Sequence, residues 1–319
     1  MSTPARNPLP TLFTIHGGGF CLGAPRDDDE WNRAFADRYG VQVVALSYTK
    51  APSGPFPTAL HDLEALYLAV VADASIPTDN RTALLGFSAG GNLALTLSQL
   101  PTIQECTAPP RAVTSVYGCL DLSLHSGVKT GSRQYKPTLS PPRNSRKDAL
   151  LDLVAVFDWS YIPYGQELRD PLLSPAYAPR SALPPYVCIV AAELDMLAHE
   201  SWRMACRLAN EEQAARGLSP ARRLPDATST DKNLRLVGRE QPAKSKGKLE
   251  TNNERFGWEE RWDGSGIKWL LVPDVTHGFD NVHIRELMGG KESIRDAEAK
   301  TDAYCRVVAE WLLDVVWKT

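Results

Sequence analysis

The sequence predicts a single α/β domain with a mostly parallel central sheet and helices on both of its faces. Apolar runs of strand length alternate along the chain with amphipathic stretches of helix length, which is the pattern of a parallel sheet. The 319 residues, 43% of them hydrophobic, suffice for the core of one large domain. Two of the apolar runs end in glycine-rich turns, as expected where a strand bends sharply into the next element.

The elements follow one another in a regular order. Strands are expected at residues 12–15, 41–46, 82–85, 112–117, 186–192 and 267–272. Helices are expected at residues 27–39, 57–73, 91–97, 150–159 and 291–317. The chain contains no internal repeat, so we expect one domain over residues 1–319.

Two stretches interrupt the alternation. Residues 121–165 follow a strand and are rich in proline, tyrosine and basic residues, which indicates an insertion. Residues 217–266 contain ten basic and seven acidic residues between Ala221 and Arg261, and few apolar residues before Phe256. Because such a segment cannot bury enough apolar surface to offset its ordering entropy, we expect a charged, flexible insertion at the surface.

The sequence Gly86-Phe87-Ser88-Ala89-Gly90 stands between a predicted strand and a predicted helix. A sharp turn from strand to helix strains its corner residue, requires small neighbours and exposes the corner side chain at the end of the sheet. The spacing therefore predicts that Ser88 is a nucleophile, with the N–H group of Ala89 at a helix N-terminus. Alone, this five-residue pattern also occurs in ordinary loops.

A second glycine-rich turn, His16-Gly17-Gly18-Gly19, follows the first strand. Its glycines let the backbone bend until consecutive N–H groups face one point, where they can hold a negative oxygen. The alternative is a flexible turn with no binding role. Because this turn and the serine turn both end strands, we expect them to act together.

A serine hydroxyl needs a neighbouring base, and the base needs an orienting acid. Outside the glycine turn, His277 is the one histidine that follows a strand and precedes a glycine, so it is the candidate base. Asp195, after the strand at residues 186–192, is the candidate acid. Glu193 is close enough to compete for that role, Glu200 lies further along the next helix, and an acid after a strand is also a common helix N-cap.

These residues lie in blocks that resemble the hormone-sensitive-lipase branch of the α/β-hydrolase superfamily, the α/β-hydrolase-3 family of carboxylesterases. From about residue 10 to the end, the matching blocks are His16-Gly17-Gly18-Gly19, Ser47-Tyr48-Thr49-Lys50-Ala51-Pro52 with Pro55-Phe56-Pro57, Gly86-Phe87-Ser88-Ala89-Gly90-Gly91, Asp170-Pro171-Leu172-Leu173-Ser174-Pro175, Asp195-Met196-Leu197-Ala198-His199-Glu200 and His277-Gly278-Phe279. Their order and spacing make the resemblance specific.

The resemblance implies an α/β-hydrolase fold with an inserted cap. It implies that Ser88 is the nucleophile, His277 the general base and acid, and Asp195 the orienting carboxylate. It further implies an oxyanion hole formed by the N–H groups of Gly18, Gly19 and Ala89, with His16 holding the glycine turn.

The chain departs from the family pattern in three places. Phe87 precedes the serine, where the family often has Asp or Thr. The block Tyr48-Thr49-Lys50-Ala51-Pro52-Ser53 lacks the arginine and glutamate of the family's Tyr-Arg-Leu-Ala-Pro-Glu, so a local ion pair of the family is not expected here. The N-terminal part is shorter than usual, with about ten residues before the first strand, so we expect a lid that is reduced or built from other segments.

In the resembling family, an insertion at the place of residues 121–165 forms part of the cap over the substrate pocket. The candidates to line an acyl or alcohol pocket are aromatic residues of the insertion and two beside the motifs, namely Phe157, Trp159, Tyr161, Tyr164, Phe20 and Phe87. The alternative is that these aromatic side chains only anchor the insertion to the sheet.

Charge and composition argue against several classes of protein. The 35 Lys and Arg residues against 38 Asp and Glu residues give a net charge of −3, which is no electrostatic footprint for nucleic acid or anionic membrane. The N-terminus lacks the apolar stretch of a secretion signal and no long apolar run occurs, so we expect a cytoplasmic protein without stable membrane association. The six cysteines are scattered, so neither a metal site nor a disulfide framework is suggested, and no cofactor is expected.

Together these observations predict a serine hydrolase that cleaves small to medium soluble carboxylic esters through an acyl-enzyme intermediate. Its partner is expected to be a small-molecule ester, and the sequence leaves open whether the chain forms an oligomer. A lactonase or an amide hydrolase is the alternative among enzymes, because these substrates react through the same tetrahedral state. The alternative from another class is a non-catalytic ligand-binding protein on the same scaffold, as in plant hormone receptors that resemble the family but have lost the histidine base.

Overall fold

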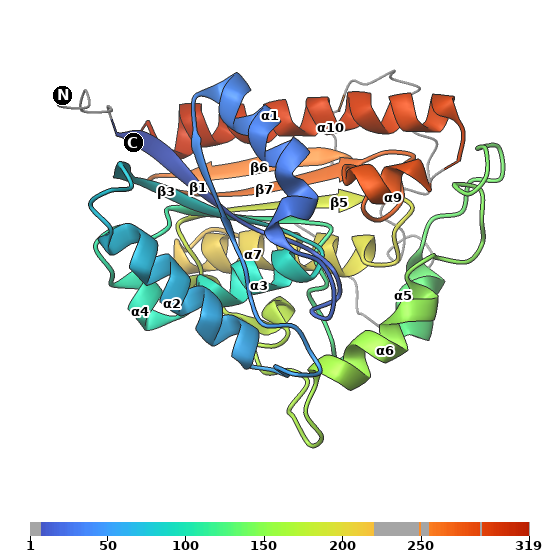
Figure 1. Cartoon of the computed structure of the whole chain (residues 1–319), viewed down its shortest axis with the longest axis horizontal. Coiled ribbons are helices and arrows are strands. Elements are labelled where there is room, and N and C mark those ends of the chain that lie inside the picture. The colour runs from blue at the N-terminus through green and yellow to red at the C-terminus, as the bar shows by residue number, and fades with distance from the viewer. Residues whose placement is uncertain (1–7, 220–248, 250–254, 288, 319) are drawn as a thin grey trace.

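The computed structural model describes residues 8–219, 249, 255–287 and 289–318, which form one seven-stranded sheet with helices on both faces (Figure 1). The strand order is β2-β1-β3-β4-β5-β7-β6, and all neighbours are parallel except β6 and β7. The strands are β1 (Leu9–Ile15), β2 (Gln42–Leu46), β3 (Thr78–Phe87), β4 (Ala112–Val116), β5 (Tyr186–Ala192), β6 (Gly257–Trp262) and β7 (Ser265–Val272). The predicted mostly parallel sheet is confirmed.

The helices cover the sheet in two layers, with α1 and α10 on one face and α2, α3 and α7 on the other (Figure 1). The helices are α1 (Asp29–Tyr39), α2 (Thr58–Ala72), α3 (Ala89–Leu97), α4 (Pro101–Gln104), α5 (Ser126–Ser132), α6 (Leu151–Tyr161), α7 (Ala198–Ala215), α9 (Val282–Glu286) and α10 (Lys291–Trp311). A π-helical turn, Leu312–Val316, continues α10, and short 3₁₀ turns occupy Pro25–Asp28, Pro175–Tyr177 and Arg180–Ala182.

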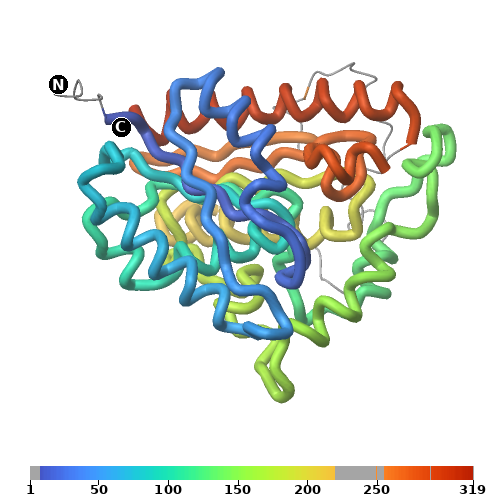
Figure 2. The backbone as a smooth tube through the Cα atoms, in the orientation of Figure 1, coloured from blue at the N-terminus to red at the C-terminus, as the bar shows by residue number. Residues whose placement is uncertain are grey.

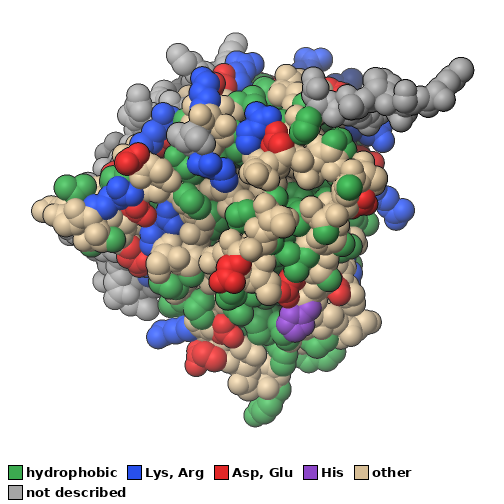
Figure 3. All heavy atoms as spheres, turned by 90° about the vertical axis from the view of Figure 1, so that its left-hand side faces the viewer, with side chains coloured by type: hydrophobic (Ala, Val, Ile, Leu, Met, Phe, Trp, Pro, Cys, Tyr) green, Lys and Arg blue, Asp and Glu red, His purple; other side chains and the backbone are tan. Residues whose placement is uncertain are grey.

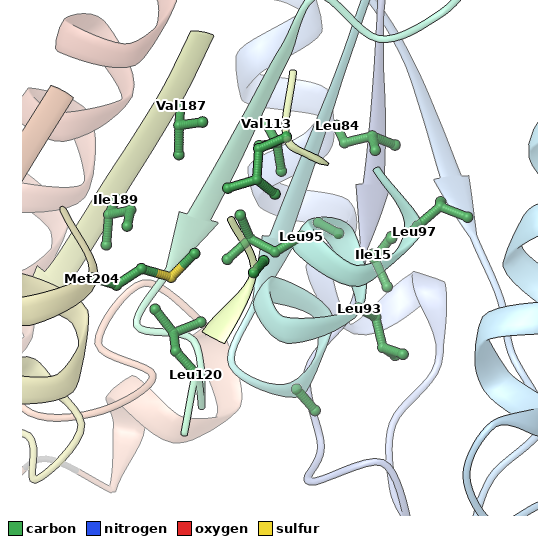
Figure 4. Packing of buried hydrophobic residues seen from close by; sticks show 14 of the residues in the cluster. Ile15, Leu84, Leu93, Leu95, Leu97, Val113, Leu120, Val187, Ile189 and Met204 are labelled. Carbon is green, nitrogen blue, oxygen red and sulfur yellow. The ribbon is translucent and has the colours of Figure 1, made fainter. Parts of the chain in front are cut away.

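The core consists of two apolar clusters, one on each side of the sheet. Because successive strand residues point to opposite faces, Leu84 packs toward α3 and its neighbour Leu85 toward α10. Figure 4 shows the first cluster, in which side chains of β1, β3, β4 and β5 meet those of α3 and Met204 of α7. Both faces of the parallel strands are therefore buried, which explains why these strands read as continuous apolar runs.

The expected flexible insertion at residues 217–266 includes an unpredicted strand, β6, at Gly257–Trp262. Trp262 pairs with Ser265, so Asp263 and Gly264 form a two-residue hairpin turn in which Gly264 has a φ of +72°. An Asp-Gly turn next to a strand is a strong hairpin signal, and it could have revealed β6. The rest of the segment, residues 220–248 and 250–254, lies outside the described residues.

The insertion at residues 121–165 carries α5 and α6. Figure 2 shows its chain, in green, at the side of the molecule toward which β5 and its parallel neighbours run. On the face at the left of Figure 1, side chains of both charges are interspersed with apolar ones (Figure 3). Among the helices of the described residues, none combines the length and apolar character needed to cross a membrane.

Candidate active site

Ser88 occupies the corner between β3 and α3, where the backbone is strained. Its φ of +54° and ψ of −119° lie in a region that a residue with a side chain rarely adopts, at a cost of about 1–3 kcal/mol. A Cβ atom on Gly86 would lie 1.9 Å from the carbonyl oxygen of Gly90, and one on Gly90 would lie 2.0 Å from that of Ile15. Only glycine fits at either position, because the atoms in the way are backbone.

The structure brings Ser88, His277 and Asp195 together from the ends of three strands. Nε2 of His277 lies 2.8 Å from Oγ of Ser88, and Nδ1 of the same ring lies 2.7 Å from Oδ2 of Asp195. His277 follows β7 and Asp195 follows β5, and these two strands are neighbours in the sheet. The arrangement has the geometry of a nucleophile, a base and an orienting acid.

Glu193, the other candidate for the acid, pairs with two cations and not with the imidazole of His277. Its buried carboxylate accepts hydrogen bonds from Lys136 at 2.6 Å and Arg255 at 2.7 Å, and from the backbone N–H of Asp274 at 2.9 Å. It therefore holds the loop that leads to His277, while Asp195 contacts the imidazole itself. The backbone N–H of Leu197 donates to the other oxygen of Asp195 at 2.9 Å.

The charges around His277 favour its protonated form. Burial acts to lower the pKa of the His277 imidazole, but the charge of Asp195 and its hydrogen bond outweigh burial, so that the pKa is raised. The carboxylates of Asp148 and Asp280 act in the same direction. Tyr117 packs its ring edge-on against the imidazole, 4.7 Å between centroids, and its hydroxyl donates to Asp280.

The glycine turn lies directly against Ser88. A Cβ atom on Gly17 would lie 3.2 Å from Cβ of Ser88, and Gly18 and Gly19 have φ values of +113° and +58°. In the described part of the chain, the backbone N–H groups of Gly18, Gly19 and Ala89 donate to no recorded acceptor. Ala89 is the first residue of α3, so its N–H group has no partner within the helix.

His16 holds the glycine turn through a hydrogen bond to its backbone. Burial is the largest influence and lowers the pKa of His16 to about 4, so the ring is neutral near pH 7. Its Nδ1 lies 2.7 Å from the carbonyl oxygen of Gly17, so Nδ1–H donates to that oxygen, and the ring stacks on Tyr48. Lys50, which stands in the place of the family's leucine, lies with its ammonium group over the Tyr48 ring.

Two cavities flank Ser88. The larger, about 310 Å³, is bordered by the glycine turn, Phe87, His277, α6 and α9. The smaller, about 50 Å³, is bordered by Phe20, by Met196 and by α6. Phe157 of α6 lines both cavities, as do Gly19, Ser88 and Leu150, so its ring lies where the two cavities meet beside the serine.

Trp159 does not line either cavity, and the prediction that it does is wrong. Its side chain is 79% exposed. Residues 150, 153, 154 and 157 share the face of α6 toward the cavities, and residue 159 lies about 200° further around the helix than residue 157. Tyr164 is also exposed, whereas Tyr161 is buried and stacks on Phe20 as an anchor of the insertion.

Other residues at this site had no role in the sequence prediction. Tyr117 directly follows β4, and this position at a strand end was a signal that could have identified it. Asp28 lines the larger cavity, where burial, followed by the charge of Asp280, raises its pKa to about 7. Asn281 and Ile284 also line it, but nothing in the sequence distinguishes α9 as a cavity wall.

Among the described residues, no group of three or more His, Cys, Asp or Glu side chains is arranged to hold a metal ion. The polar groups next to Ser88 are the imidazole of His277 and the backbone N–H groups of the glycine turn and Ala89.

A family model described as the alpha/beta hydrolase fold matches residues 12–218, which is more than half of the chain. The chain belongs to this α/β-hydrolase family. The resemblance expected from the sequence motifs is thus confirmed. The match runs from within β1 to just past the end of α7 and includes the glycine turn, Ser88 and Asp195.

Several relatives of this α/β-hydrolase carry names of ester-cleaving proteins. It is 31% identical over 191 residues to an acetyl-hydrolase of Streptomyces hygroscopicus, covering 60% of this chain and 59% of that protein. It is 30% identical over 204 residues to an arylesterase of Saccharolobus solfataricus, covering 62% and 61%. The chain thus matches about three fifths of the length of these relatives.

Solved structures show the same fold. The hyperthermophilic esterase from Pyrobaculum calidifontis superposes with a TM-score of 0.64 at 23% identity, covering 97% of this chain and 78% of that one. At this identity the likeness concerns the α/β-hydrolase fold alone.

We expect Gly90→Ala to destabilise the fold by about 3 kcal/mol or more, because the new methyl group would overlap the backbone of β1. Gly131→Ala is the matched control, since Gly131 lies in α5 with open space around it and alanine favours a helix. Urea unfolding followed by circular dichroism measures both. Equal stability of the two variants would contradict this account of the turn.

We expect the imidazole of His277 to titrate above pH 6.5, because the charge of Asp195 opposes and exceeds the effect of burial. Below this raised pKa the ring is protonated and cannot accept the proton of Ser88. In Asp195→Asn the titration midpoint should fall, while that of His16 stays near its lowered value. Side-chain NMR titration measures both rings, and an unchanged midpoint for His277 would disprove the role given to Asp195.

Proposed function

We propose that the protein is a serine hydrolase that cleaves carboxylic esters through an acyl-enzyme intermediate. The observation that carries this proposal is the continuous series of hydrogen bonds from Ser88 through His277 to Asp195, at the wall of a cavity. The names of the relatives, acetyl-hydrolase and arylesterase, support an ester as substrate.

The reaction follows from this geometry. As Oγ of Ser88 attacks the carbonyl carbon of the ester, Nε2 of His277 takes the hydroxyl proton, and Asp195 stabilises the resulting imidazolium. His277 then gives this proton to the departing alkoxide, which leaves as the alcohol. Water, deprotonated by the same nitrogen, attacks the acyl-enzyme and releases the carboxylic acid and the free serine.

The negative oxygen of the tetrahedral intermediate needs donors that are already in position. The N–H groups of Gly18, Gly19 and Ala89 are the candidates, because they lie around Ser88 and have no recorded acceptor in the described residues. One such donor contributes about 3 kcal/mol to lowering the barrier. The same three N–H groups could also hold the oxyanion formed from a lactone or an amide. Lactones and amides are therefore assayed beside esters.

The cavity walls indicate the kind of ester. Asp27 and Asp28 border the larger cavity, and no Lys or Arg side chain does so among the described residues. In the larger cavity a substrate carboxylate would meet these acidic groups without a Lys or Arg beside it, and Lys129, which borders the smaller cavity, is already paired with Glu200 at 2.7 Å, so neutral esters are favoured. Because the two cavities differ in size, the bound ester has one short and one longer arm.

We expect Ser88→Ala to abolish the burst of p-nitrophenol from p-nitrophenyl acetate and to lower turnover by roughly 10⁴-fold or more. Ser98→Ala is the control, because Ser98 is a buried serine at the other end of α3 that donates to the Leu95 carbonyl and borders neither cavity. Wild-type protein that is folded but cleaves no ester, lactone or amide would contradict the proposal and favour a ligand-binding protein.

We expect Phe157→Ala to widen the space beside Ser88 that both cavities share and to admit esters with two long arms. The ratio of kcat/KM for p-nitrophenyl hexanoate to that for the acetate should rise by about tenfold, since a single methylene in an apolar pocket already changes selectivity by that order. Trp159→Ala, an exposed aromatic on the same helix, should leave the ratio unchanged. If both variants behave alike, Phe157 does not limit the substrate.

A further inference from the structure

Two side chains of the insertion hold the turn that carries Asp195. Arg133 follows α5 and Asp148 precedes α6, and each side chain is 4% exposed. Nε of Arg133 lies 3.1 Å from Oδ2 of Asp148. This buried ion pair therefore closes the loop between α5 and α6 upon itself.

The pair contacts the backbone on both sides of Asp195. Nε of Arg133 donates to the carbonyl oxygen of Leu194 at 2.7 Å, and the N–H group of Met196 donates to Oδ2 of Asp148 at 2.8 Å. The two residues that flank the orienting acid are thus each fixed by one member of the pair.

The same carboxylate is bonded to the helix that forms the cavity walls. Oδ1 of Asp148 accepts a hydrogen bond from the N–H group of Leu150 at 2.9 Å, at the start of α6. Leu150 and Phe157 line both cavities beside Ser88. Through Asp148, the position of α6 and the position of the Asp195 turn are fixed by one side chain.

The charge of Asp148 also links the ion pair to His277. Burial, followed by the nearby charge of Asp195, raises the pKa of Asp148, while Arg133 and two backbone N–H groups act to lower it. The charge of Asp148 in turn contributes to the raised pKa of His277. The other charged groups that face this imidazole are Asp195 and Asp280, and Tyr117 faces it with its ring edge.

We propose that Arg133 and Asp148 are positioning residues that align Asp195 with His277 and join this alignment to the placement of α6 over the substrate cavities. The inference rests on the proposed hydrolase function. It assigns to the insertion a part in the proton transfer as well as in the shape of the cavity. Neither residue touches the reacting atoms.

The test is the double variant Arg133→Gln with Asp148→Asn, which removes both charges and keeps side chains that form hydrogen bonds. We expect kcat for p-nitrophenyl acetate to fall by roughly 10- to 100-fold, as a small misplacement of a catalytic group does, with KM changed less. Of the two charges removed, that of Asp148 raises the pKa of His277, whereas Arg133 is not among the main influences on that pKa, so the acidic limb of the pH profile should move to lower pH.

The matched control is Arg180→Gln with Glu212→Gln, a largely buried ion pair, 2.9 Å apart and 9% and 13% exposed, that borders neither cavity. It should lose thermal stability but keep kcat and the acidic limb. Arg133→Lys is a second variant in case the double one does not fold. Lysine retains the positive charge but lacks the planar guanidinium group that donates to Asp148 and Leu194 together. We therefore expect kcat to fall several-fold while the acidic limb of the pH profile stays in place.

A double variant with lowered Tm but wild-type kcat and acidic limb, measured well below Tm, would overturn the inference and leave the pair a purely structural role. The same holds for Arg133→Lys if its kcat equals that of the wild type. Failure of the proposed function looks different, because the wild type itself would then be inactive in the same assay.

Discussion

The close approach of three backbone segments at the corner of Ser88 is the constraint on which the site depends. Gly86 and Gly90 bring the start of α3 against the end of β1, and no side chain could be accommodated between them. Because β1 and β3 are neighbours in the sheet and run parallel, the turn after β1 lies beside the serine that follows β3. The order of strands then supplies the other groups, with Tyr117 after β4, Asp195 after β5 and His277 after β7.

This convergence buries several carboxylates, and each of them is stabilised by different partners. Asp195 is neutralised in part by the imidazole, Asp148 by Arg133 and backbone N–H groups, and Asp280 by the hydroxyls of Tyr117 and Tyr304. A buried carboxylate without such partners would be far less stable in its charged form. Three negative charges near one imidazole also explain why its pKa rises in spite of its burial.

The sequence allowed the fold and the convergence of the three polar side chains to be predicted, because parallel strands are buried on both faces and end at one edge. Position along the chain left Glu193 as a rival to Asp195, and the family resemblance implied Asp195. The contacts of Glu193 with Lys136 and Arg255 give Glu193 a separate structural role. β6 was missed because its charged residues resemble a surface loop, although Asp263 and Gly264 carried the hairpin signal.

The residues that line the cavities were the least predictable part, and the insertion shows why. Its aromatic content is plain in the sequence, but which aromatic faces the serine depends on the rotation of α6 about its axis. That rotation is set by contacts between distant residues, such as Arg133 with Asp148 and Phe20 with Tyr161, which no local pattern encodes. The segment that determines the shape of the cavity is therefore oriented by the same ion pair that holds the turn of Asp195.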